Sequence, residues 1–460
     1  MSIDATAGVL RRNGTVPVHR TLSGLLRDPV NALAEMGRRA GGEIVRLRLG
    51  PLRPYLVTHP DHVQQVLRSD WTNYRREGMF WRPLRRMIGA SVLGEDEPWE
   101  SSRKILQPLF TRRYIDSIAG EMAGVINARV AELDEYAQAG QPIDVMEEMS
   151  RIVNRAVLRV LFGDRITREE GERLAPAYDT AATSINFRLL MPFMPYSVRV
   201  PGDRAFMKAV RTVDDVVFPV IRRARADHGD GLDVISALCR VGEEDGTGID
   251  DRQIRDNLVS VYGAASESTA MTLTWLWPIL QDHPEVAARL REEVDRVVGA
   301  GPAVPGHLPE LRYTRMVLQE LLRLYPAGWI FPRMATKSAE VGGVRVKAGA
   351  QVLISPYATH RLDAFWDRPL EFDPERFAPD AQERRHRYSY FPFGGGPHQC
   401  LGRHLFDVEA PLMVAAIMSR FRPEVVTAGP MTPFPAASLR PREKVMLNLV
   451  PLRSAPGVAA

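Results

Sequence analysis

Residues 391–402 read FPFGGGPHQCLG, and this stretch decides the fold because it presents one cysteine in a glycine-rich loop. Cys400 comes directly before a helix that we expect over 401–420. A thiolate there would face the backbone N–H groups and the positive end of that helix, which favour ionised sulfur. The alternative is an ordinary turn with a buried, inert cysteine. The length of the whole string makes that alternative the weaker interpretation.

An ionised sulfur on such a loop is the axial ligand that a haem iron needs. Gly394 can adopt backbone angles closed to other residues, and Gly402 lets the next helix leave at short range. Phe393 can shield the sulfur from water, and the hydrogen bonds to a thiolate tune its electron donation. His398 is placed to reach a haem propionate. The stretch therefore predicts a haem-thiolate centre in which Cys400 binds the metal.

The string FGGGPHQCLG at 393–402 resembles the haem-binding motif of the cytochromes P450, the haem-thiolate monooxygenases. Glu320 and Arg323 resemble the E-x-x-R pair of that family, since i,i+3 spacing places them on one helix face. Arg376, in the PERF segment 374–377, matches the arginine that joins this pair in the family. The resemblance implies a buried structural triad, in which removal of one member costs about 3–5 kcal/mol. The alternative for the pair alone is a solvated helix face.

Two further motifs resemble the residues that hold the haem propionates. Trp99 and Arg103 lie at i,i+4, which stacks them on one helix face. Arg333 follows Arg323 by ten residues, at the place of a strand arginine in the family. Partly buried propionates need cationic partners. The chain is rich in arginine, so the assignment of Arg103, Arg333 and His398 depends on their placement relative to the other motifs.

Residues 252–282 are expected to form one long, mostly apolar helix with GAASESTA, residues 263–270, at its centre. The family pattern here is A-G-x-(D/E)-T-(T/S). The resemblance aligns Ala264 with the alanine beside the haem, Ala265 with the glycine, Glu267 with the acid and Ser268 with the threonine.

An acid and an alcohol beside a local break in this helix can relay protons to bound oxygen, so Glu267 and Ser268 are the predicted catalytic residues. Serine keeps the hydroxyl but lacks the methyl group that restricts the threonine rotamer. Ala265 leaves less room for a helical bulge than glycine would. A register with Thr269 as the working alcohol is the alternative, and an ordinary helix with a polar spot is another. Pro278 is expected to kink or end the helix.

The substrate pocket is assigned by resemblance to apolar stretches on the haem face opposite Cys400. Core packing is an equally good interpretation of each residue alone, but together they favour a hydrophobic ligand at about 25 cal/mol per Å² buried. The turn PAGW at 326–329 is similar to that of some bacterial terpene oxygenases, which suggests a terpene-like or polyketide-like substrate. The predicted substrate-binding residues are Phe80, Trp81, Ile88, Phe187, Leu190, Tyr262, Ala265, Trp329, Ile330 and Phe434.

The pattern of the whole chain predicts a mainly α fold with small β-sheets, the cytochrome P450 fold, with haem between the long central helix and the cysteine loop. A single haem domain is expected over 27–451, after a partly irregular segment 1–26 and before a flexible tail 452–460. A formal net charge of +4 argues against nucleic-acid binding. Helices are expected at 119–138, 142–162, 204–228 and 284–299, a hairpin at 43–48 with 55–57, and a second strand pair at 344–346 with 351–354.

Only two cysteines occur, Cys239 and Cys400, and a thiolate ligand leaves no disulfide, which fits the reducing cytoplasm. The N-terminus shows no apolar run of anchor length, so we expect a monomeric bacterial enzyme without a membrane anchor. No flavin or iron–sulfur domain is recognised. Electrons from NAD(P)H would therefore arrive through a ferredoxin and its reductase. A docking surface is expected from Arg112, Arg113, Arg384, Arg385, Arg387 and Arg403, although solvated side chains without a partner are the alternative.

These observations predict a haem b enzyme that inserts one oxygen atom from O2 into a hydrophobic molecule by hydroxylation or epoxidation, in secondary metabolism. The replaced residues Ala265 and Ser268 keep a second reading open, in which the same haem performs phenol coupling, a peroxygenase reaction or a rearrangement. A non-catalytic haem binder is the third. Loss of coupling between NAD(P)H use and product in a Ser268→Ala variant separates the first two.

Overall fold

Helices form most of the chain in this computed structural model, which describes residues 24–25, 27–48, 52–185, 187–188, 194–227, 231–241, 249–382 and 385–452. The chain divides into two units. Unit 1 takes its described residues from Met1–Gly78, Gln319–Cys400 and Thr432–Arg442, and unit 2 takes its own from Met79–Leu318, Leu401–Met431 and Glu443–Ala460. Each unit joins three separate stretches of chain, and the single domain over 27–451 is not tested by this division. That domain stays a prediction.

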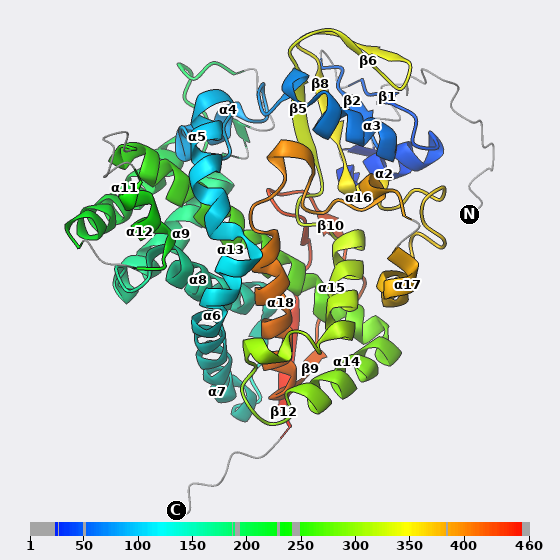
Figure 1. The fold of residues 1–460 in the computed structure, drawn as a ribbon. Helices are drawn as coiled ribbons and strands as arrows, with labels where there is room; N and C mark the ends of the chain where they lie inside the picture. Colours follow the sequence, from blue (N-terminus) through cyan, green and yellow to red (C-terminus); the bar gives the residue numbers. More distant parts are fainter. Residues whose placement is uncertain are drawn as a thin grey trace, which may run out of the picture. The chain divides into compact units, whose positions relative to one another are not determined.

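Unit 1 contains a five-stranded sheet in the order β1-β2-β8-β5-β3, of which β1, β2, β5 and β8 are labelled in Figure 1. Strands β2 and β8 run parallel, and the other neighbours are antiparallel. Apolar side chains of these strands, such as Val57, Val352 and Ile354, are completely buried and form a core cluster. The strands are β1 (Val45–Arg46), β2 (Tyr55–Val57), β3 (Tyr74–Arg75), β5 (Phe331–Ala335) and β8 (Gln351–Ile354).

The predicted hairpin at 43–48 and 55–57 is confirmed, since β1 and β2 pair in antiparallel fashion with Val45 opposite Leu56. Its connecting residues 49–51 lie outside the described residues. The second predicted pair is wrong. Strand β7 (Val344–Val346) pairs with β6 (Ala339–Val341) instead of with β8. Gly342 and Gly343 have positive φ angles of 52° and 76°, which a two-residue hairpin turn needs at both central positions.

Short helices surround the sheets of unit 1. Helix α2 (Pro29–Arg39) starts with a proline after the capping residue Asp28, whose carboxylate accepts a hydrogen bond from the Asn31 N–H. The others are α3 (Pro60–Gln64), α16 (Pro356–Thr359) and α17 (Pro379–Gln382), a π-helical turn at Gln65–Ser69, and 3₁₀ turns at Trp71–Asn73, Pro374–Phe377, Arg387–Ser389 and Gly396–His398. Strands β10 (Pro433–Phe434) and β11 (Arg440–Pro441) form a small sheet of their own. One of the boundaries between the units falls inside α15 (Arg312–Leu324).

Unit 2 contains the long helices. Within it α13 packs on α8, α11 on α9, and α18 on α6. The helices are α4 (Arg82–Ile88), α5 (Asp96–Leu106), α6 (Arg112–Glu132), α7 (Asp134–Gln138), α8 (Val145–Phe162), α9 (Arg168–Ser184), α11 (Asp203–Ala226), α12 (Val234–Arg240), α13 (Asp251–Asp282), α14 (Pro284–Val297) and α18 (Arg403–Met418), with 3₁₀ turns at Gln107–Phe110 and Pro305–His307. A small sheet has the order β4-β12-β9, from Ile143–Asp144, Met446–Pro451 and Phe421–Val425.

The long central helix predicted at 252–282 is confirmed as α13. The Asp250 carboxylate caps its start by accepting a hydrogen bond from the Gln253 N–H at 2.7 Å. The helix continues through Pro278, and α18 likewise continues through Pro411, so neither proline ends its helix. The helix predicted at 142–162 is α8, and it begins three residues later than predicted, at Val145. Ile143 and Asp144 instead form strand β4, which pairs with β12.

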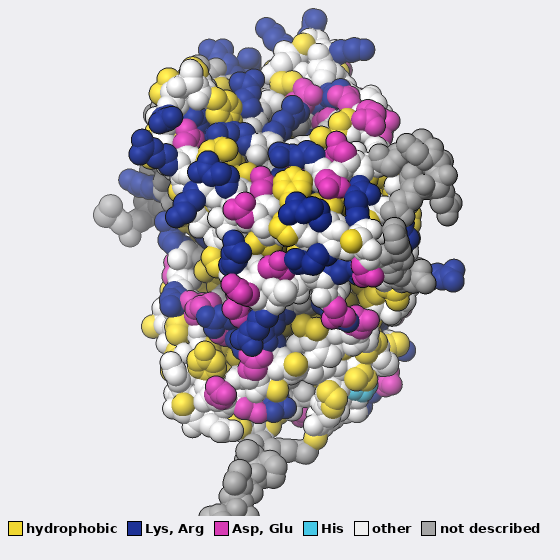
Figure 2. All heavy atoms as spheres, turned by 90° about the vertical axis from the view of Figure 1, so that its left-hand side faces the viewer, with side chains coloured by type: hydrophobic (Ala, Val, Ile, Leu, Met, Phe, Trp, Pro, Cys, Tyr) yellow, Lys and Arg dark blue, Asp and Glu magenta, His cyan; other side chains and the backbone are white. Residues whose placement is uncertain are grey.

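The surface of the protein carries both signs of charge. On the face shown in Figure 2, Lys and Arg side chains in dark blue are interspersed with Asp and Glu side chains in magenta. Such mixing agrees with the small formal net charge of +4. Among the helices of the described residues, none combines the length and the apolar character that a membrane crossing requires.

Candidate active site

The cysteine loop folds as a tight hairpin in unit 1. The Cys400 N–H donates to the Phe393 carbonyl at 2.9 Å, and the Gly394 N–H donates to the Phe391 carbonyl at 2.9 Å. Gly394 and Gly396 have φ angles of 70° and 68°, which favour glycine strongly. A Cβ on Gly396 would also lie 1.9 Å from a backbone oxygen. The loop leaves Cys400 exposed, as a metal ligand must be.

His360 holds the start of this loop through a hydrogen bond to its backbone. Sequence reasoning missed this histidine. Its Nε2 accepts a hydrogen bond from the Phe391 N–H at 3.0 Å, and its Nδ1 lies 3.1 Å from the Arg323 carbonyl oxygen. Because a carbonyl can only accept, the proton of the neutral ring is on Nδ1. The ring is completely buried, and that burial holds the pKa of His360 well below its usual value. The imidazole therefore joins the helix of Arg323 to the cysteine loop.

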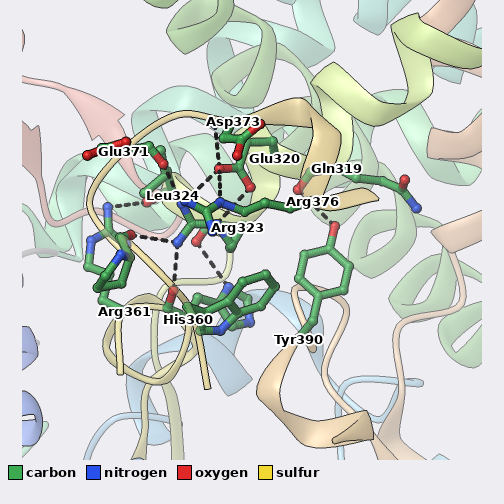
Figure 3. Close-up of polar contacts among 12 residues, drawn as sticks. Gln319, Glu320, Arg323, Leu324, His360, Arg361, Glu371, Asp373, Arg376 and Tyr390 are labelled. Carbon is green, nitrogen blue, oxygen red and sulfur yellow. Dashed lines mark hydrogen bonds and ion pairs between the residues drawn. The ribbon is translucent and has the colours of Figure 1, made fainter. Parts of the chain in front are cut away.

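Glu320, Arg323 and Arg376 meet in the network that Figure 3 shows. Arg323 binds the Glu320 carboxylate in a bidentate fashion, because its Nε and Nη2 donate to the two carboxylate oxygens at 2.7 and 2.8 Å. The side chains of Arg323 and Glu320 are completely buried. Arg376 Nε lies 3.4 Å from the same carboxylate. Arg323 also donates to the carbonyls of His360, Pro369 and Glu371. These are the three residues of the predicted structural triad.

The predicted propionate partners are found in both units. In unit 1, Arg333 is buried on β5, and His398 is half-buried with its ring edge-on to Trp71 at 5.3 Å. In unit 2, Trp99 is buried on α5, and Arg103 one turn later donates to the Gln107 side chain at 3.1 Å. Trp99 and Arg103 thus share a helix, as their spacing predicted.

The middle of α13 has one accessible face. Ala264 is exposed, although every residue from 254 to 263 in the same helix is buried. The Ser268 hydroxyl donates to the Ala264 carbonyl at 2.8 Å, so both residues lie on that face. Ala265 and Glu267 keep part of their surface accessible. The expected local break is absent, since α13 is α-helical through all its residues. Alanine at 265 lacks the backbone freedom of the glycine that it replaces.

Thr269, the alternative alcohol, faces away from that side. Its side chain is buried beside Glu409 of α18, which packs on α13. Glu409 is itself completely buried, and this burial raises the pKa of its carboxyl to about 8, although Thr269 lowers it slightly. The accessible alcohol of the helix is therefore Ser268. Sequence reasoning missed Glu409, because no motif of the sequence marks it.

The predicted substrate-binding residues have different surroundings. Phe80, Trp81, Phe187, Ile330 and Phe434 are half-buried, whereas Ile88 is buried. Leu190 lies outside the described residues.

Two aromatic residues of the same set are engaged in packing. The Tyr262 hydroxyl donates to Asn154 on α8 at 3.1 Å. Tyr262 precedes Ala264 by two residues in α13, so the two side chains point about 200° apart around the helix axis. Trp329 Nε1 donates to the Ala436 carbonyl at 3.1 Å. Neither contact belongs to the accessible face of α13.

The arginines predicted as a docking surface divide between the units. Arg112, Arg113 and Arg403 of unit 2 are exposed. Arg387 of unit 1 is exposed, while Arg384 lies outside the described residues. Arg385 is different, because its guanidinium stacks on Trp366 at 4.5 Å and burial lowers its pKa. Arg385 is therefore a packing residue.

Comparisons with known proteins identify the family of this chain. The family model for cytochrome P450 matches residues 20–449. Pentalenene oxygenase of Streptomyces avermitilis is 30% identical over 440 residues, which cover 95% of this chain and 96% of that protein. Cyclooctatin synthase of Streptomyces melanosporofaciens is 34% identical over 447 residues, covering 94% and 92%. The crystal structure of cytochrome P450DA heme domain superposes with a TM-score of 0.86 at 23% identity, covering 97% and 98%. The chain belongs to the cytochrome P450 family.

Each unit, taken by itself, offers residues that fit the haem that this family binds. Cys400 offers an accessible thiol, and the loop around it uses a glycine where a Cβ would clash. Ala264 offers a small accessible side chain directly after the buried stretch 254–263 of α13. The enzyme is a haem-thiolate monooxygenase that uses O2, receives electrons from a redox partner and oxidises a hydrophobic small molecule.

Proposed function

We propose that this P450 hydroxylates or epoxidises a terpene-like hydrocarbon of secondary metabolism, with Cys400 as the iron ligand. The observation that carries the chemistry is an accessible thiol in a loop whose backbone is fixed by His360 and by two glycines with positive φ. The substrate class is supported by relatives named as oxygenases of pentalenene and of cyclooctat-9-en-7-ol, which are terpenoids. When bound, haem supplies oxygen activation, and thiolate donation from Cys400 favours O–O cleavage.

Glu267 and Ser268 are proposed to deliver protons on the oxygen side. Ser268 is supported by its place on the accessible face, where its hydroxyl bonds to the Ala264 carbonyl. Glu267, one residue earlier, keeps accessible surface and can exchange its proton with water. The Ser268 hydroxyl must rotate away from that carbonyl to donate elsewhere, and serine has the rotamer freedom to do so.

The propionates are proposed to bind Trp99, Arg103, Arg333 and His398, which offer N–H donors of the kind that a carboxylate needs. Phe393 and Gly394 would lie under the macrocycle, and Gly402 would give α18 its close start, since the Phe406 N–H donates to the Gly402 carbonyl at 3.0 Å. Of the apolar residues, the proposal keeps those with accessible surface as substrate contacts: Phe80, Trp81, Phe187, Ala265, Ile330 and Phe434.

The test combines a spectrum with turnover. Reduced protein under CO should show the thiolate-type spectrum, and a panel of cyclic sesquiterpenes and diterpenes should displace iron-bound water and yield oxygenated products. Ser268→Ala should lower product per NAD(P)H about a hundredfold, the lower end of the range for lost general acid–base catalysis. The matched control is Thr274→Val, because Thr274 makes the same bond to a carbonyl four residues back. Unchanged coupling in Ser268→Ala, or turnover of polyketides alone, would contradict the proposal.

A second candidate function is favoured by the unbroken α13. A helix without a break, and a Ser268 hydroxyl held by the Ala264 carbonyl, suit a peroxide-driven oxidation that needs no proton delivery. Hydrogen peroxide should then support full turnover without any reductase. Turnover that depends strictly on the electron-transfer proteins would exclude this candidate.

Electrons are proposed to come from NAD(P)H through a ferredoxin and its reductase, to a monomeric enzyme in the cytoplasm. Four cationic or potentially cationic groups of unit 2 surround Asp407, namely Arg112, Arg315, Arg403 and His404. An acidic ferredoxin would find a complementary surface there. Arg112→Glu and Arg403→Glu should raise the KM for ferredoxin and weaken its dependence on salt, whereas Arg204→Glu should change neither. Equal KM values in all three variants would rule out this surface.

A further inference from the structure

Tyr178 of α9 is seated directly on the backbone of α13. A Cβ built on Gly263 would lie 1.6 Å from the Tyr178 hydroxyl oxygen and 2.0 Å from Cζ, so only glycine admits the phenol at this point. The Tyr178 ring also meets the Tyr262 ring edge-on, with centroids 5.3 Å apart. Tyr262 is held in turn by its hydrogen bond to Asn154 on α8. Three helices therefore fix the position of the Tyr178 hydroxyl.

That position lies one helical turn before Glu267. Residues at i and i+4 share a helix face, and side chains lean toward the N-terminus of their helix. By this rule we expect the Glu267 carboxylate to lean back toward Gly263, beside which the Tyr178 hydroxyl lies. Electrostatics agree, because the pKa of Tyr178 is raised first by burial and then by the Glu267 carboxylate, while Arg255 lowers it. At neutral pH Tyr178 is thus a neutral phenol that can donate a hydrogen bond.

We propose that Tyr178 is a positioning residue for Glu267: the phenol, seated in the gap at Gly263, offers the carboxylate a donor, directly or through one water. Without this donor, the flexible glutamate side chain would sample more rotamers and deliver its proton less often. This inference rests on the proposed role of Glu267. It adds a residue of a different helix, α9, to the control of proton delivery.

The functional test compares Tyr178→Phe with Tyr114→Phe. Tyr114 is a matched control, since burial also raises its pKa, to about 12, but Asp233, Arg240 and Glu121 surround it. Tyr178→Phe should lower product per NAD(P)H about tenfold, the effect of losing a hydrogen bond to a charged group, with little change in substrate affinity. In a Glu267→Gln background, Tyr178→Phe should lower product per NAD(P)H by less than about twofold, because the carboxylate through which Tyr178 acts is absent. An equal loss in both backgrounds, or an effect on substrate affinity alone, would overturn the inference.

A second variant approaches the contact from the other helix. Gly263→Ala should displace the phenol and reproduce the loss of coupling seen in Tyr178→Phe. Gly124→Ala on α6 is its control, because a Cβ there meets no atom within 4 Å. Normal coupling in Gly263→Ala, in protein with a normal ferrous–CO spectrum, would count against the inference.

Unfolding measurements keep the inference separate from the proposed relay. A double-mutant cycle in urea unfolding measures the Tyr178–Glu267 interaction energy without turnover. It compares the midpoints of the wild type, Tyr178→Phe, Glu267→Gln and the double variant. We expect the two single effects to be non-additive, and additivity would overturn the contact. If Glu267→Gln leaves coupling intact, the relay and the functional part of this inference both fall, whatever the cycle shows.

Discussion

The cysteine side in unit 1 and the α13–α18 pair in unit 2 both bury ionisable groups, but they satisfy them differently. In unit 1 the Glu320 carboxylate has two arginines, and both nitrogens of His360 have backbone partners. In unit 2 Glu409 has Thr269 as a polar neighbour, and no ion pair to it occurs among the described residues. The comparison teaches that the cysteine loop rests on a compensated network, while α18, which packs on the central helix α13, carries a carboxyl that burial keeps protonated.

The largest effect should come from the ligand itself. Cys400→Ala removes the thiolate that the whole network of unit 1 presents, so the thiolate-type ferrous–CO spectrum and all turnover should vanish. Cys239→Ala is the control, since Cys239 is buried in α12. A thiolate-type spectrum in Cys400→Ala would show that the two regions have been assigned wrongly.

The compensated network should be costly to break. Arg323→Ala leaves the Glu320 carboxylate buried beside Arg376 alone and should lower the free energy of unfolding by about 3–5 kcal/mol. Arg38→Ala provides a matched control, because Arg38 and Glu35 form an i,i+3 pair that is well exposed and worth less than about 1 kcal/mol. Urea denaturation of the two variants measures both numbers. Equal losses would mean that burial of the pair adds nothing.

Glu409 tests the other half of the comparison with the opposite sign. In the folded protein the pKa of Glu409 is about 8, above the ordinary 4.5. The folded state therefore binds more protons than the unfolded state between these two values. The free energy of unfolding consequently falls as pH rises from about 4.5 to 8. Glu409→Gln keeps the shape without that proton loss and should stabilise the protein by about 3 kcal/mol at pH 7. The gain should shrink below pH 5. A loss of stability at pH 7 would show that the carboxylate is compensated after all.

His360 should produce the smallest effect, an acid-dependent one. Its folded pKa is depressed, so its contribution is complete above the unfolded value of about 6.5 and is lost as pH falls toward the folded pKa. The slope for one such group is about 1.4 kcal/mol per pH unit. His360→Gln keeps an acceptor for the Phe391 N–H and should flatten the pH dependence of the free energy of unfolding between about pH 6.5 and 5. The difference between the variant and the wild type cancels the contribution of Glu409, which both proteins share. An unchanged slope would exclude His360 as the acid-sensitive group under the loop.

Much of the fold was predictable because its patterns are local. The α13 helix follows from apolar periodicity and an aspartate cap, and the E-x-x-R pair follows from i,i+3 spacing. The failures have physical reasons as well. Strand β7 pairs with β6 and not with the predicted partner β8, because Gly342 and Gly343 form a two-residue hairpin turn between β6 and β7. Helix α8 starts late because Asp144 belongs to a strand whose partner lies some three hundred residues further along the chain.

By itself, the sequence indicated the chemistry of the site: one cysteine in a glycine-rich loop, a Glu–Arg pair at i,i+3 spacing, and an acid–alcohol pair in an apolar helix. Tertiary structure alone decided which alcohol is accessible, that His360 holds the loop, that Glu409 is buried without a cation among the described residues, and that Tyr178 rests on Gly263. The reason is physical. Motifs record contacts between residues a turn apart, whereas burial and pKa depend on side chains that only folding brings together.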